Sequence, residues 1–329
     1  MKILITGSAG FIGYHLTRSY LQRGIEVVGI DNFVPAYPTL IKYKRKEKLE
    51  KDFSAFKHIT MDLNDPKLQG VVKDFQPDVV CNLAAVAGVR DSIEHPHRFI
   101  KCNINGFLNL LEAIKESKNP ARLVYASSSS VYGKQEIQPL VETQRIDTPI
   151  SLYAATKASN ELMAHCYSEL FGIQTIGLRF FTVYGTWGRP DMALWIFTEK
   201  ILNNEPLPIF GYGKMKRDFS YIDDIVEGIT AACETPALPK YEIYNLGNDK
   251  SEGLLDLVAT IEKATKKVAV KNLLPMQLGD VVENHVDVSR AKQDLGFQNK
   301  INISEGVPKF VAWYREHPEI AEDVKNWRS

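Results

Sequence analysis

The chain has 329 residues, 44% of them hydrophobic, enough to build one large domain or a large and a small one. Its 40 basic residues balance 40 acidic ones, so net charge draws it neither to nucleic acid nor to an anionic membrane. The four cysteines lack a CxxC spacing and no apolar run reaches the length of a membrane span, so we expect a cytoplasmic protein with no nucleic-acid and no membrane partner.

Short β-rich runs alternate with stretches of helical periodicity through the first half of the chain. The predicted strands are Lys2–Thr6, Glu26–Ile30, Ala55–Thr60, Val79–Leu83, Arg122–Ala126 and Gln174–Phe180. The helices predicted between them include Phe11–Arg23, Pro66–Phe75, Phe99–Ser117 and Tyr153–Phe171. This alternation indicates an α/β fold with a doubly wound parallel sheet of the Rossmann type.

The alternation weakens after about Gly185, where prolines and glycines become frequent. Further helices are predicted at Met192–Leu202, Asp223–Glu234, Leu254–Thr265 and Ser304–Glu316. This pattern is typical of a smaller mixed lobe. We therefore predict a dinucleotide-binding domain over residues 1–185 that carries the catalytic residues. A substrate-binding lobe is predicted over residues 186–329, and one segment of this lobe can pair with the large sheet.

A glycine-rich turn follows the first predicted strand, with Gly7, Gly10 and Gly13 just before a helix. Glycine allows a tight turn, and the helix start offers unpaired N–H groups to a pyrophosphate. An ordinary tight turn is the alternative, but Asp31 at the end of the second strand is placed to bind a ribose diol and to repel a 2′-phosphate. The pattern therefore favours NAD. Asp62, Leu63 and the run Leu83–Ala85 also end strands, where each is equally well explained as a strand-end cap.

Tyr153 and Lys157 lie four residues apart on a predicted helix, so their side chains share one face. A phenol is a poor base at neutral pH because its pKa lies near ~10, but a nearby ammonium favours the phenolate. Four serines, Ser127–Ser130, follow the fifth strand at the same sheet edge. One of these hydroxyls is placed to relay a proton to Tyr153. The alternatives are a solvated helix face and a serine turn that caps backbone groups.

Two polar clusters are assigned structural roles. The basic run Lys42–Lys48 is followed by acidic residues, and we interpret it as the solvated face of an exposed helix. His95 and His97 lack a third ligand at useful spacing, so no metal site is expected.

These motifs resemble the extended short-chain dehydrogenase/reductases, and within them the UDP-glucuronate 4-epimerases of bacteria and plants. The resemblance covers nearly the whole chain. The stretches that carry it most specifically are Asn82–Arg90, Tyr125–Gly133, Ser151–Lys157, Leu178–Gly185, Gly188–Met192 and Lys214–Asp224.

The resemblance implies that Ser128, Tyr153 and Lys157 are catalytic and that NAD is the cofactor. Related dehydratases and decarboxylases carry an acid in the serine region, whereas this chain has only hydroxyls, which favours epimerisation at carbon 4 of a UDP-sugar. For a uronic acid, the likeness places Ser127, Ser129, Thr182 and Arg189 near the sugar carboxylate. Neutral-hexose epimerases usually have asparagine at the position of Thr182.

The likeness also supplies the remaining contacts. Arg217 and the backbone around Ile209 and Phe210 resemble diphosphate and uracil contacts, and the absence of a second arginine before the Gly-Asp pair that ends in Asp280 puts more of the diphosphate on Arg217. Gly88, Arg90 and Asp280 complete the expected substrate set. The expected cofactor set is Gly7, Gly10, Phe11, Ile12, Gly13, Asp31, Asn32, Asp62, Leu63, Leu83, Ala84, Ala85, Ala87, Asn103, Tyr153, Lys157 and Phe180.

Three alternatives stay open at this point. One is a 4-epimerase of neutral or N-acetylated UDP-hexoses, and another is a non-catalytic NAD-binding regulator. The third concerns assembly: the family likeness implies a homodimer through a helix pair, but core packing explains the apolar positions equally well. These positions are Phe107, Leu110, Leu111, Ile114, Ala158 and Leu162.

Overall fold

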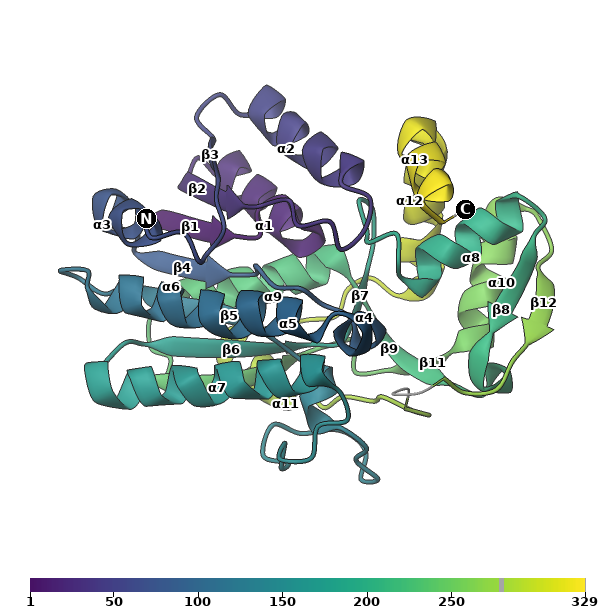
Figure 1. The fold of residues 1–329 in the computed structure, drawn as a ribbon. Helices are drawn as coiled ribbons and strands as arrows, with labels where there is room; N and C mark the ends of the chain where they lie inside the picture. Colours follow the sequence, from purple (N-terminus) through teal and green to yellow (C-terminus); the bar gives the residue numbers. More distant parts are fainter. Residues whose placement is uncertain (278–280, 329) are drawn as a thin grey trace.

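The computed structural model describes residues 1–277 and 281–328. Within these ranges, seven strands form one parallel sheet in the order β10-β6-β5-β4-β1-β2-β3 (Figure 1). Its strands are β1 (Lys2–Thr6), β2 (Glu26–Asp31), β3 (Lys57–Thr60), β4 (Val79–Asn82), β5 (Arg122–Ser128), β6 (Thr175–Phe180) and β10 (Tyr241–Leu246). The strand order reverses direction beside β1, and ligands bind at such a switch point of a parallel sheet. The predicted fold class is confirmed.

Helices cover both faces of this sheet. They are α1 (Phe11–Gln22), α2 (Leu40–Asp52), α3 (Leu68–Phe75), α4 (Val89–Glu94), α5 (Pro96–Phe99), the π-helical turn η1 (Ile100–Asn105), α6 (Gly106–Lys115), the 3-10 turn η2 (Ser129–Tyr132), α7 (Leu152–Phe171) and α9 (Ile222–Glu234). Successive residues of β1 alternate between two buried layers: Leu4 packs on the side of α3, α6 and α7, while Ile3 and Ile5 pack on the side of α1 and α9. A strand buried on both faces is apolar along its buried middle, as this one is from Ile3 to Ile5.

The helix that carries the Tyr-Lys pair has defined ends. At its start, the Ser151 hydroxyl accepts a hydrogen bond from the backbone N–H of Ala154 (3.1 Å), which satisfies a donor that the helix itself leaves unpaired. At its end, Gly172 takes the left-handed conformation (φ 71°) that glycine adopts without strain. The start of α7 is therefore held at the sheet edge where β5 and its serines end.

A smaller group of elements extends from that same edge. It contains the mixed sheet of β7 (Thr182–Tyr184), β9 (Lys216–Tyr221) and β11 (Ser251–Gly253), and the parallel pair β8 (Pro206–Ile209) with β12 (Val270–Leu273). The helical elements of the second half are α8 (Ala193–Leu202), η3 (Phe210–Gly213), α10 (Leu254–Thr265), α11 (Ser289–Leu295), α12 (Ile303–Glu316) and α13 (Pro318–Arg328). Strand β10 leaves this group and pairs with β6 in the large sheet.

Aromatic side chains join the two groups. Tyr14 of α1 packs against Trp187, in the segment after β7, with ring centroids 5.4 Å apart, and Trp187 in turn packs against Trp313 of α12 at 5.2 Å. Such contacts bury large apolar areas. None of the described helices combines the length and the apolar character needed to cross a membrane.

Candidate active site

A cavity of about 1300 Å³ opens at the carboxyl ends of the sheet strands, between the sheet and the smaller group of elements. The structure brings most of the predicted site to its wall. The predicted cofactor residues that line it are Gly7, Gly10, Phe11, Ile12, Gly13, Asp31, Asn32, Asp62, Leu63, Leu83, Ala84, Ala85, Ala87, Tyr153, Lys157 and Phe180. The predicted substrate residues that line it are Gly88, Arg90, Ser127, Ser128, Ser129, Thr182, Arg189, Phe210 and Arg217.

Three predicted residues are placed differently. Asn103 is buried behind the wall, where its amide bonds both backbone groups of Val86 at 2.9 Å and reaches the Thr156 hydroxyl at 3.1 Å. Ile209 is buried, and its carbonyl accepts from Leu274 N–H. Asp280 lies outside the described residues.

The turn between β1 and α1 is closed so tightly that side chains are excluded. A Cβ at Gly13 would stand 2.0 Å from the Gly7 carbonyl oxygen, and a Cβ at Gly7 would stand 2.8 Å from the backbone nitrogen of Ala84. Gly7 also has a φ of 72°, which glycine adopts readily. The backbone therefore approaches the cavity without side chains in the way, and the first N–H groups of α1 face an anion-binding position.

Two acidic side chains, Asp31 at the end of β2 and Asp62 just after β3, are held in fixed orientations. Asp31 is buried, and its carboxylate accepts from the N–H groups of Ala9 (3.1 Å) and Phe33 (2.8 Å). Asp62 accepts from the side chains of Asn32 and Asn64, and these hydrogen bonds hold its pKa below the usual range although burial acts in the opposite direction. Both carboxylates are thus oriented before any ligand arrives.

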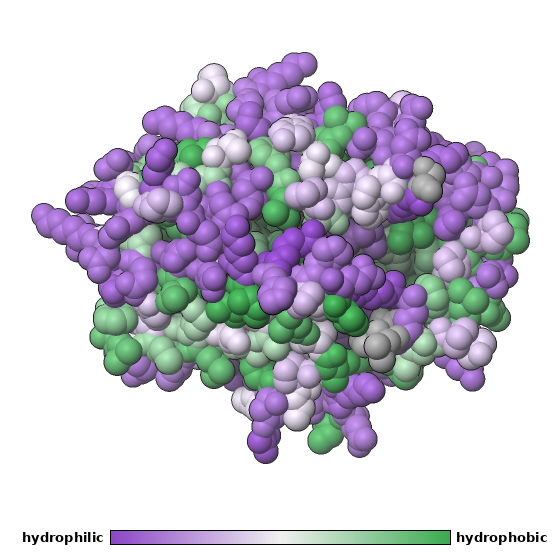
Figure 2. All heavy atoms as spheres, viewed as in Figure 1, coloured by the Kyte–Doolittle hydropathy of each residue, from purple (hydrophilic) through white to green (hydrophobic). Residues whose placement is uncertain are grey.

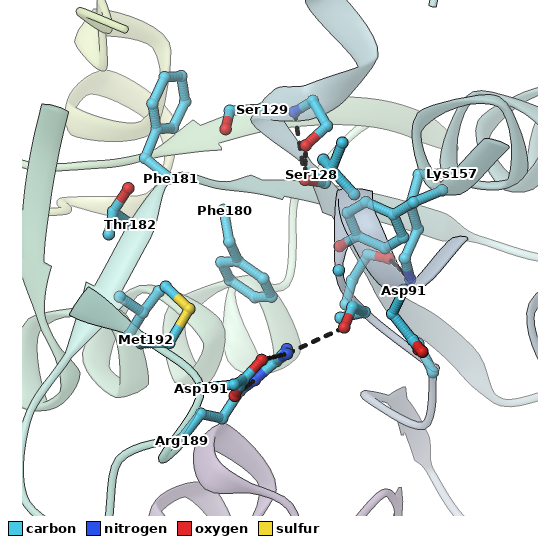
Figure 3. Close-up of a pocket in the computed structure, with 18 of the residues that line it drawn as sticks. Asp91, Ser128, Ser129, Lys157, Phe180, Phe181, Thr182, Arg189, Asp191 and Met192 are labelled. Carbon is cyan, nitrogen blue, oxygen red and sulfur yellow. Dashed lines mark hydrogen bonds and ion pairs between the residues drawn. The ribbon is translucent and has the colours of Figure 1, made fainter. Parts of the chain in front are cut away.

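Tyr153, Lys157 and Ser128 line the cavity together, and Figure 3 shows Ser128 and Lys157 on the same side of it. Burial raises the pKa of the Tyr153 phenol, while a hydrogen bond with Ser128 and the charge of Arg189 act in the opposite direction. Burial lowers the pKa of Lys157 to about 8, and its ammonium donates to the Ala126 carbonyl at 2.7 Å. Desolvation thus disfavours the charged form of both side chains.

The serine run divides between two tasks. The Ser128 hydroxyl accepts from the Ser130 N–H (3.2 Å) and so caps the turn η2. The Ser127 hydroxyl instead donates to the carboxylate of Glu161 (2.5 Å), which forms a buried ion pair with Arg179 (2.7 Å). Glu161 stands four residues after Lys157 on the same face of α7. Ser128 therefore caps the turn, as one interpretation of the serines predicted, and also lies beside Tyr153.

The segment after β7 supplies a partly buried cation. The Arg189 guanidinium pairs with Asp191 through Nε (3.0 Å) and Nη2 (2.6 Å), and Nη2 also donates to the Ala87 carbonyl (2.9 Å). Burial raises the pKa of Asp191, but the charge and hydrogen bonds of Arg189, together with the charge of Arg328, leave that pKa below its usual range. In Figure 3, Arg189 and Asp191 lie below Phe180, and Thr182 lies across the cavity from Ser128.

Side chains from the second half of the chain close the cavity. The Arg90 guanidinium lies over the Phe210 ring, 5.7 Å from its centroid, so α4 contacts the segment after β8. Arg217 of β9 donates to the Lys216 carbonyl (2.8 Å). Sequence reasoning missed Asn284, whose amide donates to the Ser129 hydroxyl at 3.2 Å across 155 positions. Only the structure could reveal that contact, because residues 281–284 form no regular element.

The structure corrects the interpretation of Lys42–Lys48 as a solvated face. Lys42 and Arg45 are buried, with exposed fractions of 7% and 0%. The remaining bases of the run do pair with acids of their own helix, for example Lys46 with Glu50. Within the described ranges, no group of three or more His, Cys, Asp or Glu side chains is placed to hold a metal ion.

A parallel sheet with a glycine turn at its switch point, and a Tyr-Lys pair on a neighbouring helix, define a dinucleotide-binding protein of the short-chain dehydrogenase/reductase class. Comparison with family models makes this more specific. The chain belongs to the NAD dependent epimerase/dehydratase family, whose model matches residues 3–247.

Individual proteins agree with this assignment. The chain is 45% identical to Protein CapI of Staphylococcus aureus, covering 96% of this chain and 99% of that protein. It is 40% identical to a probable UDP-glucuronate 4-epimerase of Rhizobium meliloti strain 1021, covering 96% and 98%. It is similar, with a TM-score of 0.90 and 36% identity over 96% of this chain and 99% of the other, to a UDP-glucuronic acid 4-epimerase of Bacillus cereus solved with UDP-glucuronic acid and NAD. The family resemblance found in the sequence is confirmed.

Proposed function

We propose that this protein is an NAD-dependent 4-epimerase that interconverts UDP-glucuronate and UDP-galacturonate. One observation carries the proposal: a single cavity brings Tyr153 and Lys157 of α7 and Ser128 of β5 together with Thr182 of β7 and Arg189 of the segment after it. The first three residues suit proton transfer at a sugar hydroxyl, and the last two suit a carboxylate. The relatives that are named UDP-glucuronate 4-epimerases support this substrate.

The described residues fit NAD. At Gly7 and Gly13 the turn leaves no room for a side chain and presents backbone to the cavity, as a pyrophosphate requires. The Asp31 carboxylate ends β2, where it suits a ribose diol and repels a 2′-phosphate. When bound, NAD would supply the hydride acceptor and donor that oxidation and reduction at carbon 4 of the sugar require.

Tyr153 performs the proton transfer. Its phenolate oxygen takes the proton of the 4-hydroxyl as the alcohol is oxidised, and gives it back once the ketone is reduced, so the enzyme ends each cycle unchanged. Burial alone would keep this phenol protonated, so the neighbouring cations are needed to make it a base. The Ser128 hydroxyl lies beside it and relays or orients the proton.

The rest of the cavity suits a uronate. The serine turn η2 and Thr182 offer hydroxyls, which can donate to a carboxylate, and Ser129 is held in place by Asn284. Arg189 supplies positive charge from the cavity wall. Arg217 lines the cavity from β9, and a guanidinium is suited to a diphosphate because it can donate two parallel hydrogen bonds.

The test is an incubation of the purified protein with a panel of UDP-sugars, followed by chromatography. We expect UDP-galacturonate to form from UDP-glucuronate without added cofactor and without net release of NADH. Faster turnover of UDP-glucose or of N-acetylated UDP-hexoses would show that the substrate is a neutral UDP-sugar and not a uronate. A chain that holds NAD but converts none of the panel would be a binding protein and would contradict the proposal.

We further propose a homodimer that packs through α6 and α7. Phe107, Leu110, Leu111 and Ile114 are at most 2% exposed and belong to the core, as the alternative interpretation held. The outer face of the pair, in contrast, leaves Leu108, Leu162 and Leu170 exposed by 40%, 67% and 73%, and Figure 2 shows hydrophobic surface over α7 at the lower left. Light scattering of Leu162→Glu tests this: a monomer is expected, against a dimer for the parent.

The division into domains and the location in the cell are proposals as well. We propose that residues 1–185, joined by the returning strand β10, form the cofactor domain, and that the other elements of residues 186–329 form the substrate lobe. A cytoplasmic location is proposed from the four free cysteines, Cys81, Cys102, Cys166 and Cys233. Fluorescence of a tagged copy in cells tests the location.

A further inference from the structure

The inner face of α2 carries a cation with an unusual environment. The Arg45 side chain has no exposed surface. Its Nη1 donates to the Ala9 carbonyl (3.0 Å) and the Tyr37 hydroxyl (3.1 Å), and its Nη2 donates to the carbonyls of Trp187 (2.5 Å) and Gly188 (3.4 Å). All four partners are neutral oxygens. A buried cation held by neutral groups contributes less stability than an apolar residue would. We therefore looked for a role of Arg45 in holding the segments that it contacts in place.

One end of the contact lies in the cofactor turn. Ala9 stands between Gly7 and Gly10, and both of its backbone groups are bound: its N–H donates to the Asp31 carboxylate and its carbonyl accepts from Arg45. The peptide groups that would face the pyrophosphate are therefore oriented by one acid and one base from outside the turn. Asp31 is also the residue that suits the ribose, so the same network spans both parts of the cofactor site.

The other end lies immediately before Arg189. The carbonyls of Thr186, Trp187 and Gly188 are all held from the cofactor domain, the first by His15 Nε2 (2.8 Å) and the other two by Arg45. Trp187 has a φ of 57°, a conformation that is strained for a bulky side chain. Such a conformation persists only where surrounding contacts impose it. Arg45 and His15 supply such contacts.

We propose that Arg45 is a positioning residue, which fixes the cofactor turn and the segment that carries Arg189 relative to each other. It joins positions 9 and 187, which are 178 residues apart and stand next to segments whose residues Gly10 and Arg189 line one cavity. The role rests on the proposed function, because the geometry it sets is that between the cofactor site and the uronate-binding side. Arg45 itself is absent from the cavity wall, so it acts through Ala9 and Arg189.

Hydrogen exchange measured by mass spectrometry on the NAD-bound protein tests the restraint without any substrate. In Arg45→Met we expect exchange to quicken about tenfold, the effect of losing one or two buried hydrogen bonds, in both 7–13 and 186–192. Arg45→Lys keeps the charge but loses the planar pair of donor nitrogens, so we expect a smaller rise of the exchange rate in the same two segments. This variant keeps the test valid if Arg45→Met fails to fold. Lys48→Met, at an exposed ion pair of the same helix, is the matched control.

Kinetics test whether Arg45 acts through Arg189. We expect Arg45→Lys to lower kcat/KM for UDP-glucuronate about tenfold, because a small misplacement of a binding group is costly, with unchanged affinity for UDP alone. Combined with Arg189→Lys, the loss should be smaller than the product of the two single losses. Unchanged exchange in either segment, a uniform rise along the chain, or multiplicative losses would each overturn the proposal. A parent protein inert toward UDP-glucuronate would refute the proposed function, whereas the exchange result judges Arg45 independently.

Discussion

The cofactor end and the sugar end of the cavity are built in different ways. The cofactor end consists of strand ends and one helix start: Gly7 to Gly13 follows β1 directly, and Asp31 ends β2. The sugar end is assembled from the segment after β7, the turn η2 and residues 281–284, which include Arg189, Ser129 and Asn284. Regular elements fix the first region locally, while the second depends on contacts between distant segments.

This difference predicts how the two ends respond to change. A substitution at the cofactor end should act on one ligand because, apart from the contact of Arg45, the groups there are held by other residues of the cofactor site. A substitution at the sugar end should disturb several groups at once, because Arg189, Asp191 and Ala87 share one network. The substitutions below test that distinction, beginning with the residue that stands between the two ends.

Tyr153→Phe should have the largest effect. Removing the phenol oxygen eliminates the proposed base, so kcat should fall by about 10²- to 10⁴-fold while NAD stays bound. Turnover is measured by chromatography of the UDP-sugars, and bound NAD by its absorbance after release from denatured protein. Tyr43→Phe, at an exposed ring, is the control. Turnover close to that of the parent would remove Tyr153 from the mechanism.

Arg189→Lys comes next and tests the sugar end. Lysine keeps the charge but cannot hold Asp191 through two nitrogens, so we expect kcat/KM for UDP-glucuronate to fall by about 10- to 100-fold. Affinity for NAD should stay constant. Arg145→Lys, at a side chain that is 85% exposed, is the control. Equal losses for UDP-glucuronate and for a neutral UDP-hexose would show that Arg189 does not recognise the carboxylate.

Asp31→Asn tests the cofactor end and should act on NAD alone. The neutral amide weakens the hydrogen bonds to the ribose diol, so the dissociation constant for NAD should rise about tenfold. The affinity for NADP should increase relative to the affinity for NAD. Calorimetric titration of the cofactor-free protein measures both constants, and Asp74→Asn on the exposed side of α3 is the control. If NADP gained nothing, Asp31 would not be the group that selects between them.

The positions of the proposed cofactor residues could be predicted from the sequence for a physical reason. Strand ends of a parallel sheet meet at one edge, and residues four apart share a helix face, so Gly7, Asp31, Tyr153 and Lys157 follow from local patterns. All four line the cavity. Helix α10 was predicted with the bounds that the structure has, Leu254–Thr265. The short strands of the second half, such as β11 with three residues, were missed because they show too few positions for a pattern.

Contacts between distant segments could not be predicted in the same way. The partner of Ser127 is Glu161, 34 residues away, and no local pattern links them. Arg45 offered a signal that was overlooked: Ile41, Arg45 and Leu49 are spaced by four, so an arginine stands between two apolar residues on one helix face. That spacing indicates burial. The surrounding lysines concealed it, since a mostly charged helix is typical of a solvated one.

His15→Gln should have the smallest effect and probes the same sugar-end segment through stability. Burial lowers the pKa of His15 to about 3, assisted by the charges of Arg45 and Arg18, although the bond to the Thr186 carbonyl opposes this. An unfolded chain binds a proton at this histidine below about pH 6.5, while the folded chain does not. The folded state therefore loses stability as pH falls below about 6.5, by up to about 1.4 kcal/mol per pH unit. Glutamine can donate to Thr186 without titrating, so urea unfolding between about pH 5 and 7.5 should show a shallower acid loss. His97→Gln, at an exposed residue, should keep the parent slope, and an unchanged slope in His15→Gln would mean that His15 is protonated in the folded protein.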